Sequence, residues 1–203
     1  MLDTHARKYV QPMIQKSARV SLQLGMTANQ MTVVAFIIGA SSGVFYYLEQ
    51  PIVAVIVLWL SGYLDAVDGT MARLTKPTPF GTVMDITFDR IVEISVILGI
   101  AALHPEAMWA LLLLSVSIII SMTIFLTVGA ISEKQGMKSF YYQAGLAERT
   151  EGFVLFSLMM LFPDWIIWTT LLFFTVELFT GFQRFMEAKR LLTEKDGVTD
   201  EEI

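Results

Sequence analysis

The chain has 203 residues, enough for one domain, and 55% of them are hydrophobic. Its mean hydropathy of +0.61 excludes an ordinary soluble domain and predicts an integral membrane protein, because several apolar runs are long enough to cross a bilayer. The absence of cysteine excludes disulfide frameworks and thiol catalysis, and the net charge of −5 gives no reason to expect nucleic acid as a partner.

Residues 1–30 form the predicted juxtamembrane arm. Its cations, which alternate with apolar residues, are Arg7, Lys8, Lys16 and Arg19. This pattern is typical of an amphipathic helix that lies in the membrane interface, and a solvated basic arm is the alternative. Thr27 or Asn29 can cap the helix that follows.

Residues 31–189 are predicted to form a core of six membrane-spanning helices, and residues 190–203 a cytoplasmic tail. The expected spans are Met31–Leu48, Ile52–Arg73, Gly81–Leu103, Met108–Ile131, Gly145–Phe162 and Trp165–Lys189. Three tight turns join them in pairs, and each contains a proline suited to a helix start. These turns are Glu49-Gln50-Pro51, His104-Pro105-Glu106 and Pro163-Asp164. The predicted fold class is therefore an all-α integral membrane protein with six transmembrane helices and an N-terminal interfacial helix.

The distribution of cations predicts the orientation in the membrane. None of the 14 Lys and Arg residues lies in the three tight turns. Because cytoplasmic loops carry the excess of Lys and Arg, the turns are expected on the far side and both termini in the cytoplasm. We therefore expect a multi-pass protein of the inner or plasma membrane, in contact with membrane lipids, whose active site opens to the cytoplasm.

Four aspartates lie between two strongly apolar runs. They are Asp65, Asp68, Asp85 and Asp89. Their spacings of three and four residues place each pair on one face of a helix. The segment Lys76–Pro79 interrupts the helix with two prolines. A helical hairpin folded about Pro77 would bring the four carboxylates to matching depths on facing helices.

Four bare carboxylates so close together would repel one another, and one ionisable residue in a membrane helix already costs roughly 2.5–3.5 kcal/mol. Two divalent cations would balance the four charges. Ligands that are all oxygen favour Mg²⁺ or Mn²⁺, and paired ions of this kind suit the binding of a pyrophosphate. We therefore predict a two-metal site; helix caps and surface charges are the alternative. The predicted ligands are Asp65, Asp68, Asp85 and Asp89.

The same region carries eight specified positions at set spacing: Asp65-x2-Asp68-Gly69-x2-Ala72-Arg73 and Gly81-x3-Asp85-x3-Asp89. This pattern resembles the signature of the CDP-alcohol phosphatidyltransferases of class I. The resemblance implies an integral membrane enzyme, usually a homodimer, that works in phospholipid biosynthesis. In such an enzyme a small polar alcohol, with or without a phosphate of its own, displaces CMP from a lipid such as CDP-diacylglycerol.

The resemblance also implies roles for individual residues. Asp89 would be the general base that takes the proton of the acceptor hydroxyl, as well as a metal ligand. Small residues would let the nucleotide approach the backbone, and the planar fork of Arg73 would bind phosphate. Taken alone, a glycine or alanine in a membrane helix is more often a packing residue. The implied donor-binding residues are Asp68, Gly69, Ala72, Arg73 and Gly81.

Three basic residues on the cytoplasmic side are candidates for binding the acceptor alcohol: Lys138, Arg149 and Arg184. The segment Gly145–Glu151 (GLAERTE) is similar to one in the branch of the family that uses inositol phosphate, where arginines grip the acceptor phosphate. The chain departs from the doubled ER-x-ER form found there, since Gly152 stands where a second arginine would be. The alternatives are that Arg149 pairs with a neighbouring glutamate and that Arg184 reaches lipid headgroups.

Two other functions share parts of this pattern. A membrane prenyltransferase that uses a prenyl diphosphate would need the metals but not Gly69, Ala72 and Arg73. A non-catalytic cation-binding membrane protein would bind metal without turnover. Release of CMP would indicate a CDP-alcohol phosphatidyltransferase, and release of pyrophosphate would indicate a prenyltransferase.

Overall fold

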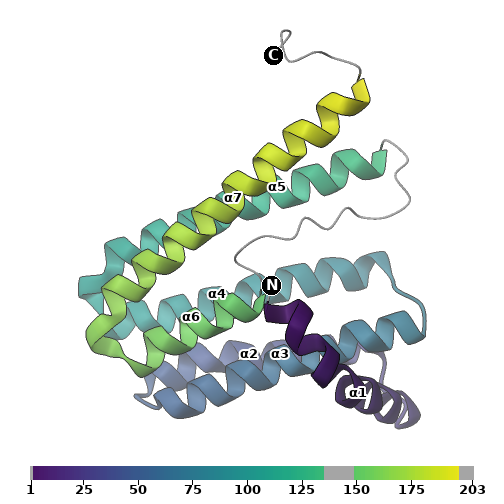
Figure 1. Ribbon diagram of the computed structural model, residues 1–203. Helices are drawn as coiled ribbons and strands as arrows, with labels where there is room; N and C mark the ends of the chain where they lie inside the picture. The colour runs from purple at the N-terminus through teal and green to yellow at the C-terminus, as the bar shows by residue number, and fades with distance from the viewer. Residues whose placement is uncertain (1, 135–148, 197–203) are drawn as a thin grey trace.

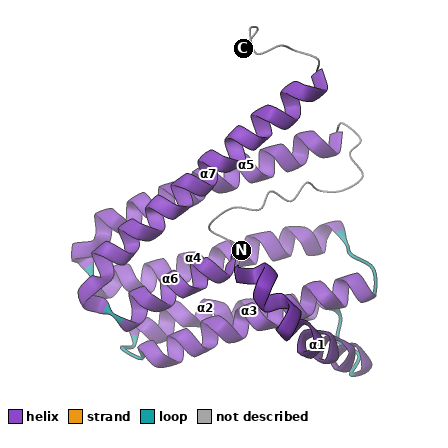
Figure 2. Ribbon diagram, in the orientation of Figure 1, coloured by secondary structure: helices purple, strands orange, loops and turns teal. Residues whose placement is uncertain are grey.

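Every element in the computed structural model, which describes residues 2–134 and 149–196, is helical. In chain order the elements are α1 (Leu2–Gln23), α2 (Ala28–Tyr47), α3 (Pro51–Leu74), α4 (Pro79–Leu103), η1 (Pro105–Ala107), α5 (Met108–Lys134), α6 (Arg149–Leu161), η2 (Pro163–Trp165) and α7 (Ile166–Asp196). The long helices run alongside one another, and α1 lies across one end of them (Figures 1 and 2). The predicted all-α class is confirmed.

The chain turns between α1 and α2 at Gly25, whose φ of +82° lies in the left-handed region that glycine adopts without strain. Thr27 then caps α2, as one of the two predicted caps. Its Oγ1 accepts the backbone N–H of Gln30 at 3.2 Å, and the Gln30 side chain accepts the N–H of Thr27 at 2.9 Å. This reciprocal capping box fixes where α2 begins.

The arm is a helix that packs on α3. Its residues Ile14 and Ala18 are buried against Val67 and Met71 of α3. α1 therefore forms a wall beside the half of α3 that carries the aspartates. Its place in the membrane interface stays a prediction.

Helix α2 packs closely against both α3 and α4, while the backbones of α3 and α4 lie farther from each other. The close approach depends on small residues. A Cβ added to Gly43 of α2 would run into the backbone carbonyl of Ser95 in α4. Ser61 of α3 donates a hydrogen bond to the carbonyl of Ala35 in α2 at 2.8 Å. The expected hairpin of α3 and α4 is therefore not closed directly on itself. Both helices pack on α2, which leaves space between them.

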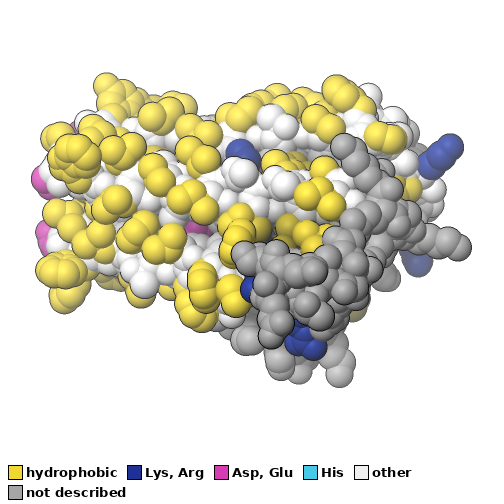
Figure 3. All heavy atoms as spheres, turned by 90° about the horizontal axis from the view of Figure 1, so that it is seen from above, with side chains coloured by type: hydrophobic (Ala, Val, Ile, Leu, Met, Phe, Trp, Pro, Cys, Tyr) yellow, Lys and Arg dark blue, Asp and Glu magenta, His cyan; other side chains and the backbone are white. Residues whose placement is uncertain are grey.

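The three predicted tight turns lie together at one end of the molecule, on the left in Figure 1. Pro51, Pro105 and Pro163 each begin the helical segment after a turn. The Tyr46 hydroxyl of α2 is 3.0 Å from Nε2 of His104, which ties the first two turns together. On the face shown in Figure 3, acidic side chains mark this end and the basic ones lie away from it.

Four helical segments are long and apolar enough to cross a membrane. They are Ala28–Tyr47, Pro51–Leu74, Pro105–Ile131 and Pro163–Arg190. Large hydrophobic side chains are exposed along these helices, as the yellow surface in Figure 3 shows, and lipid tails are the solvent that suits them. The structure is therefore that of a helical membrane protein.

Candidate active site

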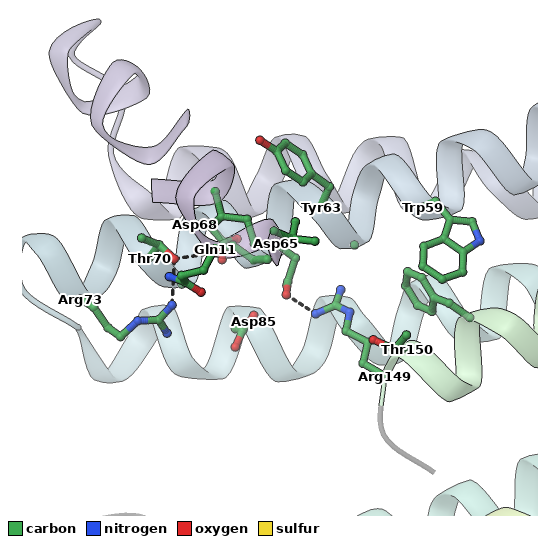
Figure 4. A pocket seen from close by; sticks show the side chains of 16 residues that line it. Gln11, Trp59, Tyr63, Asp65, Asp68, Thr70, Arg73, Asp85, Arg149 and Thr150 are labelled. Atoms are coloured by element: carbon green, nitrogen blue, oxygen red, sulfur yellow. Dashed lines mark hydrogen bonds and ion pairs between the residues drawn. The ribbon is translucent and has the colours of Figure 1, made fainter. Parts of the chain in front are cut away.

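Helices α3 and α4 bring three of the predicted metal ligands together. Asp65 and Asp68 come from α3 and Asp85 from α4, and one carboxylate oxygen of each lies within 4.8 Å of the others. Figure 4 shows the α3 and α4 carboxylates facing each other across the space between the helices. The three-residue spacing on α3 is what aims both of its carboxylates into the same space.

Asp89, one turn beyond Asp85, has a different partner. Its carboxylate forms an ion pair with Nη2 of Arg149 of α6 at 2.7 Å and accepts a hydrogen bond from Nη1 of the same arginine at 3.1 Å. Nη1 of Arg149 also contacts Oδ2 of Asp65. One guanidinium thus bridges α3 and α4 through their carboxylates, in the charge-assisted, bidentate geometry that arginine favours.

The residues fit a divalent cation. Oδ2 of Asp68 is buried and has no hydrogen-bond partner among the residues that the structure describes. An unsatisfied buried polar atom costs roughly 1–3 kcal/mol, and here it belongs to one of three clustered acids. A hard cation would give this oxygen a partner and offset the repulsion, since all the available ligand atoms are carboxylate oxygens.

A cavity of about 90 Å³ next to the cluster contains most of the predicted donor-binding residues. A Cβ added to Gly69 would meet nothing nearer than the Arg73 guanidinium at 3.5 Å, so this glycine faces open space. A Cβ added to Gly81 would lie 2.9 Å from both Asn29 Oδ1 and Thr78 Oγ1, so here the glycine permits close packing. The predicted residues that line this cavity are Asp68, Gly69, Ala72, Gly81 and Asp85.

A second, larger cavity of about 480 Å³ runs beside the cluster and is walled by α1, α3, α4 and α6. Arg73 lies at one end of it and Arg149 at the other, with Asp65 and Asp85 between them (Figure 4). The Arg73 guanidinium donates to Oγ1 of Thr70 at 2.9 Å. Two arginine side chains therefore flank the carboxylates along one cavity.

The three predicted acceptor-binding residues have different positions. Arg149 is at the aspartates, and Lys138 lies outside the described residues. Arg184 of α7 donates to Oγ of Ser121 at 3.0 Å, and its guanidinium lies 5.2 Å from the centre of the Phe125 ring. It does not line either cavity. The structure thus brings one of the three to the carboxylates.

Gly152, where the doubled-arginine pattern has its second arginine, faces α7. A Cβ added there would lie 3.4 Å from Cζ of Phe173. A long side chain at this position would meet the packing between α6 and α7. Gly152 thus lies at the contact between α6 and α7.

Several cavity residues were not predicted. They are Val10, Gln11, Ile14, Trp59, Gly62, Tyr63, Ala66, Thr70, Thr150 and Phe153. Of these, Phe153 could be predicted from the sequence, because it follows Arg149 by four residues and so lies on the same helix face. The α1 residues could not be predicted as cavity residues, since only tertiary packing places that helix against α3.

The comparisons with known proteins agree with this geometry. The family model described as CDP-alcohol phosphatidyltransferase matches residues 25–180. The chain is 33% identical over 177 residues to the inner membrane protein YnjF of Escherichia coli (strain K12), which covers 81% of this chain and 84% of that protein. It is 31% identical over 158 residues to the phosphatidylinositol phosphate synthase of Corynebacterium glutamicum, which covers 74% of this chain and 70% of that protein.

Solved structures of the phosphatidylinositol phosphate synthase of Mycobacterium tuberculosis share the fold at 21% identity. The structure with CDP-DAG bound has a TM-score of 0.71 and covers 88% of this chain and 94% of that chain. The structure in complex with manganese and citrate has a TM-score of 0.70 and covers 86% of this chain and 88% of that chain. The chain therefore belongs to the CDP-alcohol phosphatidyltransferase family and is a membrane enzyme that transfers a phosphatidyl group from a CDP-linked lipid to an alcohol.

Proposed function

We propose that this enzyme transfers the phosphatidyl group of CDP-diacylglycerol to a hydroxyl of a phosphorylated polyol of the inositol phosphate type. The observation that carries the proposal is the placing of Arg73 and Arg149 at opposite ends of a cavity with the aspartates between them. Each cation can bind one anionic substrate group. The relatives named as phosphatidylinositol phosphate and archaetidylinositol phosphate synthases support this class of acceptor.

The carboxylates Asp65, Asp68, Asp85 and Asp89 would hold two divalent ions, Mg²⁺ or Mn²⁺. When bound, such ions neutralise pyrophosphate charge and stabilise the attacking and leaving oxygens. The manganese complex of the structurally similar synthase and the unpartnered oxygen of Asp68 support a divalent ion here. Two such ions would balance the four carboxylate charges.

The donor binds at the Arg73 end of the cavity. Gly69 faces open space and Ala72 has a small side chain, so the cytidine diphosphate can lie close to the backbone of α3, in the small cavity that Gly81 also lines. Arg73 offers its planar fork to phosphate, and Thr70 holds the guanidinium in place. The lipid tails extend toward the apolar residues of the larger cavity.

The acceptor binds at the Arg149 end, next to Asp89. The hydroxyl gives its proton to the Asp89 carboxylate as its oxygen forms a bond to the lipid-side phosphorus. The bond from that phosphorus to the bridging oxygen breaks, and CMP leaves with that oxygen. Arg149 orients Asp89 through an ion pair and a hydrogen bond, and its positive charge at this end of the cavity attracts an acceptor phosphate.

The same proposal covers topology and assembly. Helices α2 to α7 would form six spans, with both termini and the active site in the cytoplasm and α1 in the interface, in a homodimer. The distribution of cations supports this orientation. Reporter domains fused after Glu49, His104 and Pro163 should read as extracytoplasmic, and one after Pro77 as cytoplasmic. Lys138 and Arg184 stay predictions as further acceptor contacts.

An acceptor screen tests the function directly. Purified enzyme is given CDP-diacylglycerol, Mg²⁺ and one alcohol at a time, and CMP is measured. We expect turnover with inositol phosphate, less with glycerol phosphate, and little with serine or unphosphorylated inositol. A preference for an uncharged alcohol would overturn the proposed acceptor. Release of pyrophosphate from a prenyl diphosphate, or metal binding without any turnover, would favour the alternative functions.

A further inference from the structure

We propose that Phe153 is a positioning residue that, supported by Trp59 and Gly62, holds the guanidinium of Arg149 between Asp65 and Asp89. The inference deepens the proposed function and rests on it for the role of Arg149 in binding the acceptor. It assigns a purpose to an aromatic group in the wall of the active-site cavity that neither the signature nor the metal site requires.

The first step is the contact between the two side chains. Phe153 follows Arg149 by one turn of α6, so both point from the same face of the helix. Cζ of Arg149 lies 5.4 Å from the centre of the Phe153 ring, within the range in which a cation is attracted to an aromatic face. The ring therefore supports the guanidinium while its nitrogens reach the carboxylates.

The second step is that the ring itself is fixed. Phe153 is only 5% exposed, and the Trp59 ring of α3 meets it edge-on at 88° with a centroid distance of 6.0 Å. The Trp59 indole donates to Oγ of Ser157 at 3.0 Å, which anchors this tryptophan to α6. A Cβ added to Gly62 would lie 2.6 Å from Cε2 of Phe153, so the ring is seated on the backbone of α3. We call this group the aromatic shelf; it consists of Trp59, Gly62 and Phe153.

The third step is why Arg149 needs a support. Arginine has many rotamers, and holding it in one of them costs conformational entropy. Here one guanidinium must face carboxylates on two different helices, α3 and α4. A shelf that limits its rotamers keeps the fork aligned with both. Without the ring, Arg149 can pair with one carboxylate or swing into the cavity, and the acceptor site loses its geometry.

The test compares Phe153→Leu with Phe153→Tyr, which keeps the aromatic face. With inositol phosphate as the probe, Phe153→Leu should raise the KM for this acceptor by about 3- to 30-fold while the KM for CDP-diacylglycerol stays unchanged. Phe153→Tyr should restore most of the acceptor affinity. The matched control is Phe156→Leu, on the same helix, whose ring packs on Phe173 at 5.1 Å instead. It should lower the melting temperature without changing the acceptor KM.

A double-mutant cycle shows whether the effect passes through Arg149. In an Arg149→Ala background, Phe153→Leu should add no further change in acceptor KM. An undiminished effect in that background would overturn the positioning role. So would a normal acceptor KM in Phe153→Leu together with a raised one in Arg149→Ala, although the proposed function would then stand. Normal acceptor kinetics in Arg149→Ala would remove the acceptor role of that arginine and this inference with it.

Gly62→Ala covers the case in which Phe153→Leu does not fold. This change leaves both Phe153 and Arg149 in place but pushes the ring off the backbone of α3. It should raise the acceptor KM in the same direction as Phe153→Leu. An unchanged acceptor KM in folded Gly62→Ala protein would count against the aromatic shelf.

Discussion

The two ends of the large cavity are built in different ways. Beside the Arg73 end lies the small cavity, which is lined by α3 and α4, two helices that follow each other in the chain, and by α2, which supports both. At the Arg149 end, a residue of α6 reaches Asp65 of α3, 84 positions away in sequence. The first end depends on spacing within a short motif, and the second on how a distant helix packs.

This difference separates two kinds of substrate recognition. The Arg73 end, with the small cavity beside it, combines small residues with a basic side chain, and these residues belong to the family signature. The Arg149 end combines a cation with an aromatic shelf and departs from the pattern of the branch that it is similar to. We therefore expect changes at one end to affect the donor and changes at the other to affect the acceptor, while the carboxylates between them serve both.

The largest effect is expected at the shared centre. Asp85→Asn removes one of three clustered carboxylates, so metal binding and turnover should both be lost. The loss of turnover should exceed the roughly 10²–10⁴-fold that a general base contributes. CMP release and Mn²⁺ binding by calorimetry are the two measurements. Asp164→Asn, an acid at the opposite end of the molecule, is the control and should keep both; substantial activity in Asp85→Asn would refute the metal assignment.

Asp89→Asn should have the next largest effect. Because Asp65, Asp68 and Asp85 remain, the KM for CDP-diacylglycerol should change little. The turnover number should fall about 10²- to 10⁴-fold, since the acceptor hydroxyl loses its proton acceptor. Single-turnover kinetics with a saturating acceptor measure this step. If Mn²⁺ affinity falls as steeply as turnover, Asp89 acts chiefly as a metal ligand and not as the base.

Crossed alanine variants test the separation of the two ends. Arg73→Ala should raise the KM for CDP-diacylglycerol, and Arg149→Ala the KM for inositol phosphate. A charge-assisted hydrogen bond contributes roughly 1.5–3 kcal/mol, which corresponds to about a 10- to 150-fold change in each case. Each variant is the control for the other, measured with both substrates. Equal effects of both variants on both KM values would show that the two ends do not recognise the two substrates separately.

The residues that could be predicted from the sequence are those whose positions follow from local spacing. The three- and four-residue intervals of the aspartates placed them on shared helix faces, and the structure brings three of them together. Thr27 could be predicted as a cap because its hydroxyl satisfies a free N–H at the start of α2. Pro51, Pro105 and Pro163 marked the turns because proline suits the first turn of a helix.

The remaining features depend on packing between distant segments. The position of α2 between α3 and α4 requires Gly43 to meet the backbone of Ser95. The spacing Gly39-x3-Gly43 indicates close packing of this helix, but it does not indicate which helices it contacts. Trp59 lies in a long apolar run, so nothing in the sequence distinguished it from its neighbours as a residue of the cavity wall. Arg184 shares its charge and its predicted side of the membrane with Arg149, but α7 directs it toward Ser121 instead.

The smallest expected effect concerns the wall that both ends share. The Tyr63 hydroxyl lies 2.7 Å from Oγ of Ser17, which joins α3 to α1 beside the cavity. Tyr63→Phe removes this hydrogen bond and keeps the ring, at a cost of roughly 0.5–1.5 kcal/mol. The docked position of α1 should therefore weaken by about 2- to 13-fold. Both substrate KM values should rise together and by no more than this factor.

The described α1 residues of the common wall are Val10, Gln11 and Ile14, and none of them is charged, so loosening of α1 should not favour one substrate. Ser17→Ala is the matched control, since it removes the same hydrogen bond from the other side. The double variant should be no worse than either single variant, as expected for two groups that share one interaction. A shift confined to the donor KM would show instead that α1 belongs to the Arg73 end. A shift confined to the acceptor KM would assign α1 to the Arg149 end. In either case α1 would serve one substrate site and would not be a wall shared by both.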